Sequence, residues 1–420
     1  MRILYISSLY APQVAGGAER VLQAQAEAMH EAGHSVGVLA LSNISGLHRD
    51  TVNGIPVWRA GQRNVYFHYD ELLQAKASRL RRTIWHVIDT YNPLMNPFIR
   101  KVVEEFHPDI ASVHNLNGWS IAAWDALKAL RVPIVQVLHD QYLLCPTATM
   151  FCQGRRCEGR CASSRILRAP HHRKLRQVDA VVGVSRFICD KLESYGYLKD
   201  LRRVTAIANV RDVSGESIPL PSCNDPGATH FGFIGTLSPS KGIEFLLETI
   251  TRIGSHDWTL SIAGGGEVGY VRSLIDRFTD SRVRFLGQMS VREFFEGIDV
   301  TVIPSLWEDT SPSVAFESLL YGRPVLGSRS GGIPELVNDS NGRLFTPGDA
   351  ADLEKSMRWA ITNRDRLRSS AHTISSSASQ FADKAKWVDD WSRVYEDVVR
   401  NAALTGRVSA GLTREVESKS

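Results

Sequence analysis

Two carboxylates, Asp309 and Glu317, are separated by seven residues in a stretch that predicts a strand, a turn and a helix. The apolar run that ends at Pro304 is typical of a buried strand leaving its sheet. Ser311 offers an N-cap hydroxyl, and Pro312 suits the first helical position, where a missing N–H costs little. Both carboxylates therefore flank the start of one predicted helix.

The start of a helix that follows a strand can bind a phosphate group. Its first N–H groups, here at Ser311, Ser313 and Val314, lack helical partners and lie at the positive end of the helix dipole. Glu317 lies on the order of 8–9 Å farther along, at about 1.5 Å per residue. A diphosphate at the helix start would then place a ribose diol near Glu317 and a hexose near Asp309. The alternative is a solvated Glu317 and a second cap at Asp309.

Two further helix entrances carry residues that can approach a phosphate. Gly16 and Gly17 precede a predicted helix over 20–30, and glycine lets a backbone come close to a ligand. The pattern is not Gly-x-Gly-x-x-Gly, so the dinucleotide fingerprint is absent, and a glycine turn without a ligand is the alternative. Lys241 stands in Ser-Pro-Ser-Lys-Gly before a helix over 243–253, where its charge suits a diphosphate.

Polar residues also follow two strands of the first half of the chain. The strand over 133–138 is followed by His139 and Asp140, and an earlier strand ends at His114. Ligand groups of α/β sheets lie at such strand ends. His139 is the predicted active-site residue here, with Asp140 either orienting it or capping the turn, and His114 is the weaker candidate.

One loop combines four cysteines with arginines. Tetrahedral zinc could be bound by four thiols that are close together. The spacing lacks a Cys-x-x-Cys pair, so free thiols are the favoured interpretation. The four residues are Cys145, Cys152, Cys157 and Cys161.

Basic segments of the first half could contact a membrane. Residues 75–99 mix Leu80, Ile84, Trp85 and Ile88 at near-helical spacing with several arginines and lysines. A basic amphipathic helix can lie on a membrane surface, although it more often packs on its own domain. A second basic run over 165–176 could attract a phosphorylated acceptor or a membrane, or be a solvated helix face.

Length and composition set the class of protein. The chain of 420 residues is long enough for two domains, and 43% hydrophobic with 22% charged residues is ordinary for a soluble protein. A net charge of +4 does not suggest a nucleic-acid partner but suits anionic substrates. No apolar run reaches the ~18 residues of a membrane span, and no signal peptide opens the chain, so we expect a cytoplasmic protein. Six cysteines in this length do not form a secreted disulfide framework.

The stretch from Val302 to Val337 resembles the Glu-x7-Glu element of the retaining GT-B glycosyltransferases of family 4. Such proteins carry an acidic residue, a small turn, a helix with a second Glu, then Gly-x-Pro-Val and Gly-Gly-x-Pro-Glu, here at 322–325 and 331–335. This chain departs by having Asp309 where Glu is usual and Ser311-Pro312 where Phe-Gly is common. The family's phosphate-binding Arg is replaced by Thr236. The resemblance covers about residues 1–401.

The resemblance implies an α/β protein of the GT-B fold, with two Rossmann-like domains facing across a cleft. The N-terminal domain would hold the acceptor and the C-terminal domain the nucleotide sugar. The predicted divisions are residues 1–209, residues 210–384, a terminal helix over 385–402 that crosses back to the first domain, and a disordered tail over 403–420.

The resemblance also implies roles for individual residues. The catalytic set would be His139 beside the donor sugar, Lys241 on the leaving phosphates and Asp309 on the hexose. The donor-binding residues would be Gly16, Gly17, Asn209, Thr236, Lys241, Leu286, Asp309, Ser311, Ser313, Val314 and Glu317. In this set, Asn209 ends the first domain and the backbone at Leu286 meets the nucleobase.

The activity implied is transfer of a sugar, with retention and without a metal, from a UDP- or GDP-sugar to a hydroxyl of a glycan or lipid-linked acceptor. Cell-surface polysaccharide synthesis, in the cytoplasm or peripherally on the inner face of the membrane, is the expected setting. Two alternatives stay open, a non-catalytic scaffold subunit that keeps the fold and a sugar-nucleotide epimerase of the same architecture.

Overall fold

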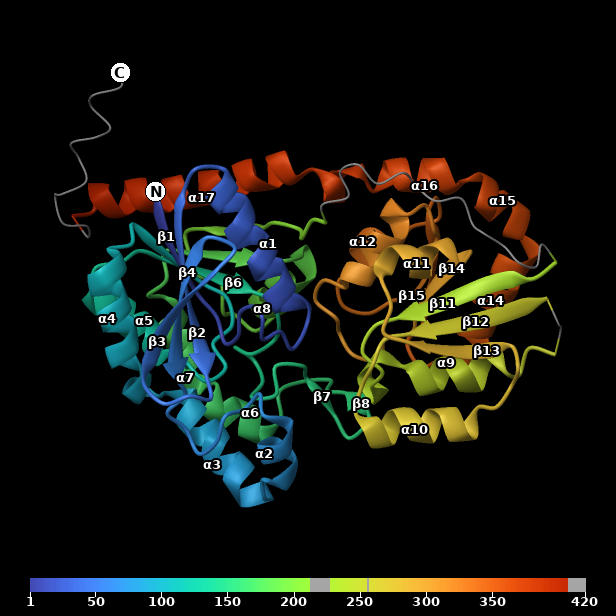
Figure 1. Cartoon of the computed structure of the whole chain (residues 1–420), viewed down its shortest axis with the longest axis horizontal. Coiled ribbons are helices and arrows are strands. Elements are labelled where there is room, and N and C mark those ends of the chain that lie inside the picture. Colours follow the sequence, from blue (N-terminus) through green and yellow to red (C-terminus); the bar gives the residue numbers. More distant parts are fainter. Residues whose placement is uncertain (212–226, 255–256, 407–420) are drawn as a thin grey trace. The chain divides into compact units, whose positions relative to one another are not determined.

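The computed structural model describes residues 1–211, 227–254 and 257–406. The chain divides into two compact units. Unit 1 consists of Met1–Ala148, Arg160–Ile207 and the segment from Ala385, and unit 2 consists of Thr149–Gly159 and Ala208–Lys384. Each unit is built on its own sheet (Figure 1). No helix among the described residues combines the length and apolar character that crossing a bilayer requires.

Unit 1 contains an eight-stranded sheet in the order β10-β9-β6-β5-β1-β2-β4-β3. All neighbouring strands are parallel except β3, which is antiparallel to β4. The strands are β1 (Arg2–Ile6), β2 (Ser35–Ser42), β3 (Leu47–Val52), β4 (Ile55–Gly61), β5 (Ile110–Val113), β6 (Ile134–Leu138), β9 (Ala180–Gly183) and β10 (Val204–Ala206). Its central strands β1, β5 and β6 are apolar runs buried on both faces, as parallel sheets require.

The helices of unit 1 connect these strands and cover the sheet. They are α1 (Gly17–Glu31), α2 (Glu71–Lys76), α3 (Arg79–Thr90), α4 (Asn96–Phe106), α5 (Ala122–Ala129), α6 (Ala162–Leu167), α7 (Ala169–Leu175), α8 (Arg186–Ser194) and α17 (Lys384–Leu404), with a 3-10 turn η1 (Pro93–Met95). The terminal helix α17 buries Trp387, Trp391, Tyr395 and Val398. It belongs to unit 1 from Ala385 onward, although it lies about 180 residues after the rest of that unit.

Unit 2 contains a six-stranded, all-parallel sheet in the order β13-β12-β11-β14-β15-β16. Its strands are β11 (Thr229–Ile234), β12 (Trp258–Ala263), β13 (Val283–Gly287), β14 (Val300–Ile303), β15 (Val325–Ser328) and β16 (Gly342–Phe345). Its helices are α9 (Ile243–Ile250), α10 (Val268–Arg277), α11 (Val291–Glu296), α12 (Ser313–Leu320), α13 (Ile333–Leu336), α14 (Ala350–Thr362), α15 (Arg364–Ser369) and α16 (Ala371–Ser377), with 3-10 turns η2 (Pro239–Lys241) and η3 (Ser379–Ala382). In Figure 1, α9 and α10 lie on one side of this sheet and α11 and α12 on the other.

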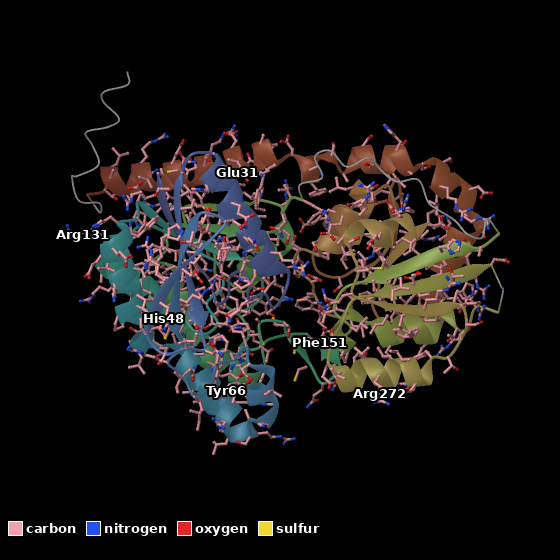
Figure 2. All side chains as sticks on the ribbon, viewed as in Figure 1. Glu31, His48, Tyr66, Arg131, Phe151 and Arg272 are labelled. Atoms are coloured by element: carbon pink, nitrogen blue, oxygen red, sulfur yellow. The ribbon has the colours of Figure 1, made fainter. Side chains whose placement is uncertain are left out.

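The parallel α/β architecture expected from the sequence is confirmed, but one segment belongs elsewhere. Residues 149–159, predicted within the first domain, form a small hairpin of β7 (Phe151–Cys152) and β8 (Arg155–Arg156) that belongs to unit 2. Phe151 marks this hairpin in Figure 2. Arg156 of this hairpin forms an ion pair with Glu308 of unit 2. No local sequence pattern predicts a contact between residues so far apart in the chain. The beginning of the predicted second domain, after Asn209, and the predicted tail lie largely outside the described residues.

The helical spacing of Leu80, Ile84, Trp85 and Ile88 is confirmed, since all four lie in α3. The rest of 75–99 falls into other elements, because Ala77 is extended with ψ 123° and prolines at 93 and 97 begin η1 and α4.

One local prediction is wrong. Ser311 does not cap α12, since Pro312 itself is the N-cap residue with an extended backbone. The Ser311 hydroxyl instead accepts a hydrogen bond from Asn209 Nδ2 at 3.2 Å.

Candidate functional site

The loop between β14 and α12 carries the acidic residues of unit 2. Glu308 and Asp309 are 6% and 7% exposed, so both carboxylates are largely removed from water. Gly331, at φ +61°, lets the loop before α13 pack on this turn, since a Cβ there would lie 2.0 Å from the Asp309 carbonyl oxygen. Gly332 N–H donates to the same carbonyl oxygen at 2.7 Å. The loop that follows β15 therefore packs against this turn and stabilises it.

A second loop, after β11, brings Lys241 to this turn. The N–H groups of Leu306 and Trp307 both donate to the Ser240 carbonyl, at 2.9 and 3.3 Å, which ties the two loops together. Lys241 Nζ forms an ion pair with Asp309 and lies 5.2 Å from the centre of the Trp307 ring. Because both side chains are mostly buried, the pair is protected from the solvent screening that weakens surface pairs.

Two arginines pair with the neighbouring acidic residues. Arg156 of the β7–β8 hairpin lies 3.3 Å from Glu308, and Arg211 Nη1 donates to Glu317 Oε1 at 2.9 Å. Three carboxylates around the start of α12 thus face three cations of the chain. A carboxylate has two oxygens and about four lone-pair directions, so one arginine contact does not exhaust its capacity to accept hydrogen bonds.

The remaining predicted residues of unit 2 occupy the ends of its elements. Ser313 and Val314 open α12, and Asn209 lies against Ser311. Thr236 is exposed in the turn after β11. Leu286 lies in β13, which is an edge strand of the sheet and is 43% exposed at this residue.

In unit 1, a buried glutamate links the glycine entrance to the end of β5. Gly16 and Gly17 are exposed at the start of α1, and Glu19 Oε2 accepts from the Gly16 N–H at 2.9 Å. The other oxygen, Oε1, accepts from Asn115 Nδ2 at 3.2 Å. Burial raises the pKa of Glu19, and these hydrogen bonds oppose that rise. The same edge of the sheet therefore carries the glycines and the residues after β5.

Two histidines stack at the ends of β5 and β6. His114 Nδ1 and His139 Nε2 are 2.8 Å apart, and the ring centres are 5.0 Å apart with an interplanar angle of 27°. Burial lowers the pKa of His139 to about 4 and that of His114 well below its usual value, so both rings are neutral at pH 7. Burial also raises the pKa of Asp140 to about 6, against the hydrogen bond that its Oδ1 accepts from the Tyr142 N–H at 2.8 Å. Of the two roles predicted for Asp140, this contact is the capping one.

The four loop cysteines do not assemble into a metal site. Cys145 is buried, Cys152 and Cys161 are exposed and Cys157 is intermediate, and none of the four forms a disulfide. Within residues 1–211, 227–254 and 257–406, no group of three or more His, Cys, Asp or Glu side chains is placed to hold a metal ion. The favoured interpretation, cysteines without zinc, stays a prediction.

Comparison with known proteins decides the family. The model of "Glycosyltransferase Family 4" matches residues 15–214, and that of "Glycosyl transferases group 1" matches residues 228–363. The chain belongs to this glycosyltransferase family. An uncharacterized 42.6 kDa protein in the cps region of Klebsiella pneumoniae is 28% identical over 80% of this glycosyltransferase and 87% of its own length. A phosphatidyl-myo-inositol mannosyltransferase of Mycolicibacterium smegmatis is 25% identical over 97% and 96% of the two chains.

Solved structures support the same fold. Sucrose-phosphate synthase from Thermosynechococcus elongatus aligns with a TM-score of 0.74 at 16% identity, covering 95% of the glycosyltransferase and 99% of that chain. HepE from Anabaena, in complex with UDP, aligns with a TM-score of 0.69 at 19% identity, covering 94% and 100%. The fold is GT-B.

Several residues in contact with predicted site residues, or close to them in the chain, are not predicted from the sequence. Arg156 belongs to the cysteine-containing loop and Arg211 follows Asn209, yet each pairs with an acidic residue near α12. Trp307 lies over Lys241, and Glu19 and Asn115 join the glycine entrance to β5. The only sequence signal for the arginines is a charge in a segment without periodicity, which does not reveal its partner.

We expect the contribution of His139 to stability to depend on pH. Because its pKa falls from 6.5 to about 4 on folding, the unfolded chain binds a proton between these values and the folded chain does not. This contribution is therefore present above pH 6.5 and is lost as the pH falls toward 4, by up to about 3 kcal/mol. The free energy of unfolding should be measured in urea at several pH values, with amide exchange in β5 and β6 as the probe. As the pH falls from 6.5 toward 4, wild type should lose more stability than His139→Gln.

The control for this titration is Tyr197→Phe. Tyr197 donates a hydrogen bond to the Arg168 carbonyl at 3.1 Å within the same unit, so its loss should cost stability by an amount that stays constant over this pH range. A difference between wild type and His139→Gln that is equally constant would contradict the assigned burial of this imidazole.

Proposed function

We propose that the protein transfers a sugar, with retention of anomeric configuration, from a nucleotide-diphosphate-sugar to a hydroxyl of a glycan or lipid-linked acceptor. The observation that carries this proposal is the ion pair between Lys241 and Asp309 at the start of α12. It joins an ammonium suited to phosphate and a carboxylate suited to sugar hydroxyls, which are the two groups that a sugar-phosphate bond requires side by side.

The proposed donor contacts follow from this pair. The diphosphate would displace Asp309 from Lys241 and lie at the N–H groups of Ser313 and Val314, where the helix dipole favours negative charge. Lys241 would then neutralise the charge that develops on the leaving phosphate. Glu317, already oriented by Arg211, would accept from the ribose diol.

The other proposed contacts involve residues outside the start of α12. The Leu286 backbone would contact the base, the Gly16-Gly17 entrance the diphosphate, and His139 the transferred sugar. We propose that Lys241 and the positive end of the α12 dipole neutralise the diphosphate, so that no metal cofactor is needed. We also propose that the reaction belongs to polysaccharide or glycolipid synthesis.

The experiment that tests the reaction is incubation with UDP- and GDP-sugars, with and without hydroxylated glycan and lipid-linked acceptors. Free nucleotide and product are followed by mass spectrometry, and the anomeric configuration of the product by NMR. Release of nucleotide with a retained configuration supports the proposal, and an inverted product contradicts retention. An isomerised donor sugar without release would instead indicate an epimerase, and no turnover would favour a scaffold.

We expect Lys241→Ala and Glu317→Ala to fail in different ways. Loss of Lys241 removes a cation that acts mainly as the phosphate departs, so kcat should fall by about two orders of magnitude or more. Loss of Glu317 removes contacts to a group that does not react, so the donor Kd measured by calorimetry should rise while kcat at saturation changes less.

The control is Lys355→Ala, which removes an exposed lysine of α14 in the same unit. Unchanged turnover in Lys241→Ala would remove that residue from the mechanism. Unchanged donor affinity in Glu317→Ala would exclude the ribose contact.

We further propose that a cavity of unit 1 binds the acceptor sugar. A cavity of about 480 Å³ lies where β2 and β4 end, at the carboxyl edge that also carries His114 and His139. Its lining combines a carboxylate, a guanidinium, amides, hydroxyls and aromatic rings, the groups that bind sugar hydroxyls and apolar sugar faces. They include Ser42, Asn43, Ser45, Gln62, Arg63, Asn64, Tyr66, Phe67 and Asp70.

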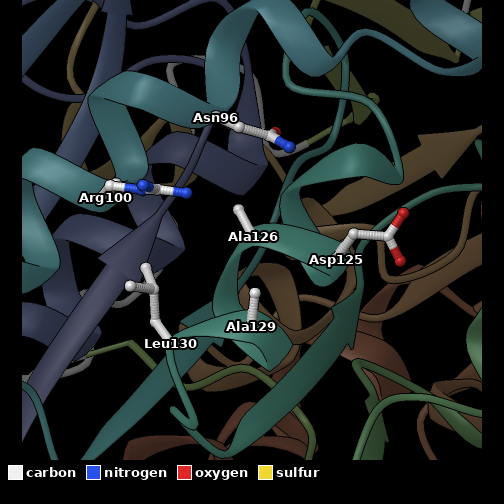
Figure 3. Close-up of a pocket in the computed structure, with 6 residues that line it drawn as sticks. All are labelled: Asn96, Arg100, Asp125, Ala126, Ala129 and Leu130. Carbon is white, nitrogen blue, oxygen red and sulfur yellow. The ribbon is translucent and has the colours of Figure 1, made fainter.

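A second pocket of unit 1 lacks these features. The groove of about 250 Å³ between α4 and α5 is lined by Asn96, Arg100, Asp125 and three aliphatic side chains (Figure 3). The Asp125 carboxylate points away from Arg100 and is held by Lys174 Nζ at 2.6 Å. Its lining has no aromatic ring, and it lies on the helices rather than at the carboxyl ends of the strands.

Asp70→Asn should test the acceptor cavity without disturbing the helix that Asp70 caps. Asp70 Oδ1 accepts from the Leu73 N–H at 2.9 Å, and asparagine is an equally good N-cap residue. Loss of the charge should raise the acceptor KM about tenfold, since a hydrogen bond to a charged group contributes about 1.5–3 kcal/mol. The donor Kd should not change.

Asp276→Asn, on the exposed side of α10, provides the matched charge-loss control. An acceptor KM that is the same in wild type and Asp70→Asn would place the acceptor elsewhere.

We also propose that a face formed by α2, α3 and α6 rests on an anionic membrane surface. Leu72, Leu80, Val87 and Ile166 are 72%, 69%, 54% and 72% exposed. Exposed Lys76, Arg79 and Arg165 stand among them. The three helices lie together at one end of unit 1 (Figure 1), where Figure 2 labels Tyr66, and the ring centres of Tyr66 and the buried Trp85 of α3 are 6.3 Å apart. Exposed apolar side chains mixed with cations suit the interface of anionic lipids.

The double variant Leu80→Glu/Ile84→Glu should lose vesicle binding without losing stability, because both side chains are exposed. Flotation with phosphatidylglycerol-containing vesicles should fall at least tenfold, and neutral vesicles should bind weakly throughout. Val268→Glu, at an 80% exposed position of α10, is the control for added charge. Equal flotation of wild type and double variant would contradict the membrane face.

A further inference from the structure

A line of hydrogen bonds runs from the terminal helix through the core of unit 1 to His139. Gln25 Nε2 of α1 donates to the Tyr395 hydroxyl of α17 at 3.0 Å, and Tyr395 donates to Ser112 Oγ of β5 at 3.0 Å. Ser112 Oγ lies 3.1 Å from His114 Nε2, and His114 Nδ1 lies 2.8 Å from His139 Nε2. Every group before His139 is at most 3% exposed, so water does not compete for these bonds.

The chemistry of each group gives this line one direction. An amide nitrogen can only donate, so the Tyr395 oxygen accepts from Gln25 and its single proton goes to Ser112. Ser112 Oγ accepts from Tyr395, and its own proton pairs with His114 Nε2 when that nitrogen is the acceptor, an arrangement that satisfies both groups. A neutral imidazole with an accepting Nε2 carries its proton on Nδ1, which His114 therefore donates to His139 Nε2.

We propose that Tyr395, Ser112 and His114 are positioning residues that hold His139 in the tautomer with its proton on Nδ1. His139 then presents an N–H donor, not a base, to its ligand. This inference rests on the proposed function only where that ligand is taken as a hydroxyl of the donor sugar. The tautomer itself is a property of the protein without substrate.

The backbone around the two histidines supports a fixed geometry. The His114 N–H donates to the Ile6 carbonyl at 2.8 Å, which extends the pairing of β5 with β1. Gln136 Nε2 donates to the His114 carbonyl at 3.3 Å and to the Val137 carbonyl at 2.9 Å, joining the ends of β5 and β6. These backbone bonds fix the ends of β5 and β6, from which the two rings approach to 2.8 Å between His114 Nδ1 and His139 Nε2.

The test is histidine-selective 15N NMR of the full chain without substrate, with the His139 signals assigned from His139→Gln. Wild type should show a pyridine-type shift for His139 Nε2 and a pyrrole-type shift for Nδ1. In Tyr395→Phe, Ser112 Oγ no longer accepts from the Tyr395 hydroxyl, so accepting from His114 becomes more favourable and the His114 and His139 protons can reverse. That variant should show a mixture of tautomers, or the reversed one.

Kinetics separate positioning from plain stabilisation. Tyr395→Phe should lower kcat about tenfold, as loss of an outer partner of a functional histidine commonly does, with little change in the donor Kd. Tyr197→Phe removes another buried tyrosine hydrogen bond of unit 1 and should leave both the tautomer and kcat unchanged. Ser112→Ala breaks the line at a smaller side chain and should repeat the tautomer change if Tyr395→Phe folds poorly.

The outcomes distinguish this inference from the function on which it builds. A pyrrole-type Nε2 on His139 in wild type would overturn it, as would an unchanged tautomer in both Tyr395→Phe and Ser112→Ala. The expected tautomer change in a protein that turns over no nucleotide sugar would leave the inference standing and remove the proposed function.

Discussion

Parallel strands end together, and this constraint decides where the functional groups of the protein can lie. In unit 1, β2, β4, β5 and β6 run parallel to β1, so the residues after them share one edge of the sheet. His114, His139, the glycine entrance and the 480 Å³ cavity all lie at that edge. In unit 2, the loops after β11 and β14 meet at the equivalent edge and bring Lys241 to Asp309. Residues far apart in the sequence therefore become neighbours, because the backbone pairing of the strands already brings their ends together.

The charges at the unit 2 edge are balanced before any ligand arrives. Unpaired buried carboxylates would cost several kcal/mol each, and the three partners Lys241, Arg156 and Arg211 remove that cost. In the proposed donor complex the diphosphate would compete with Asp309 for Lys241, so the ion pair would be exchanged for a bond to the ligand.

The sequence predicts what is local and misses what joins distant segments. The strand, turn and helix around Asp309 follow from an apolar run and a helix-starting pattern, and residues 300–320 adopt that order. The cap was assigned to Ser311 because proline is usual at the first helical position, whereas here Pro312 has an extended ψ of 105° and becomes the cap itself. Arg156 meets a partner 152 residues away, and Tyr395 one 283 residues away. No periodicity or spacing encodes such pairs, because they depend on how completed elements pack.

The protonation state of His139 limits which group can take the proton from the acceptor hydroxyl in the proposed reaction. A neutral His139 whose Nε2 accepts from His114 has no nitrogen available to take the proton of an acceptor hydroxyl. The carboxylates Glu19 and Asp140 at the same edge already accept backbone N–H groups. In the proposed reaction the departing phosphate gains negative charge as the sugar leaves, so it would be able to receive that proton. The hydrogen bonds of Tyr395 would then act on the reaction through His139 without contacting the substrate.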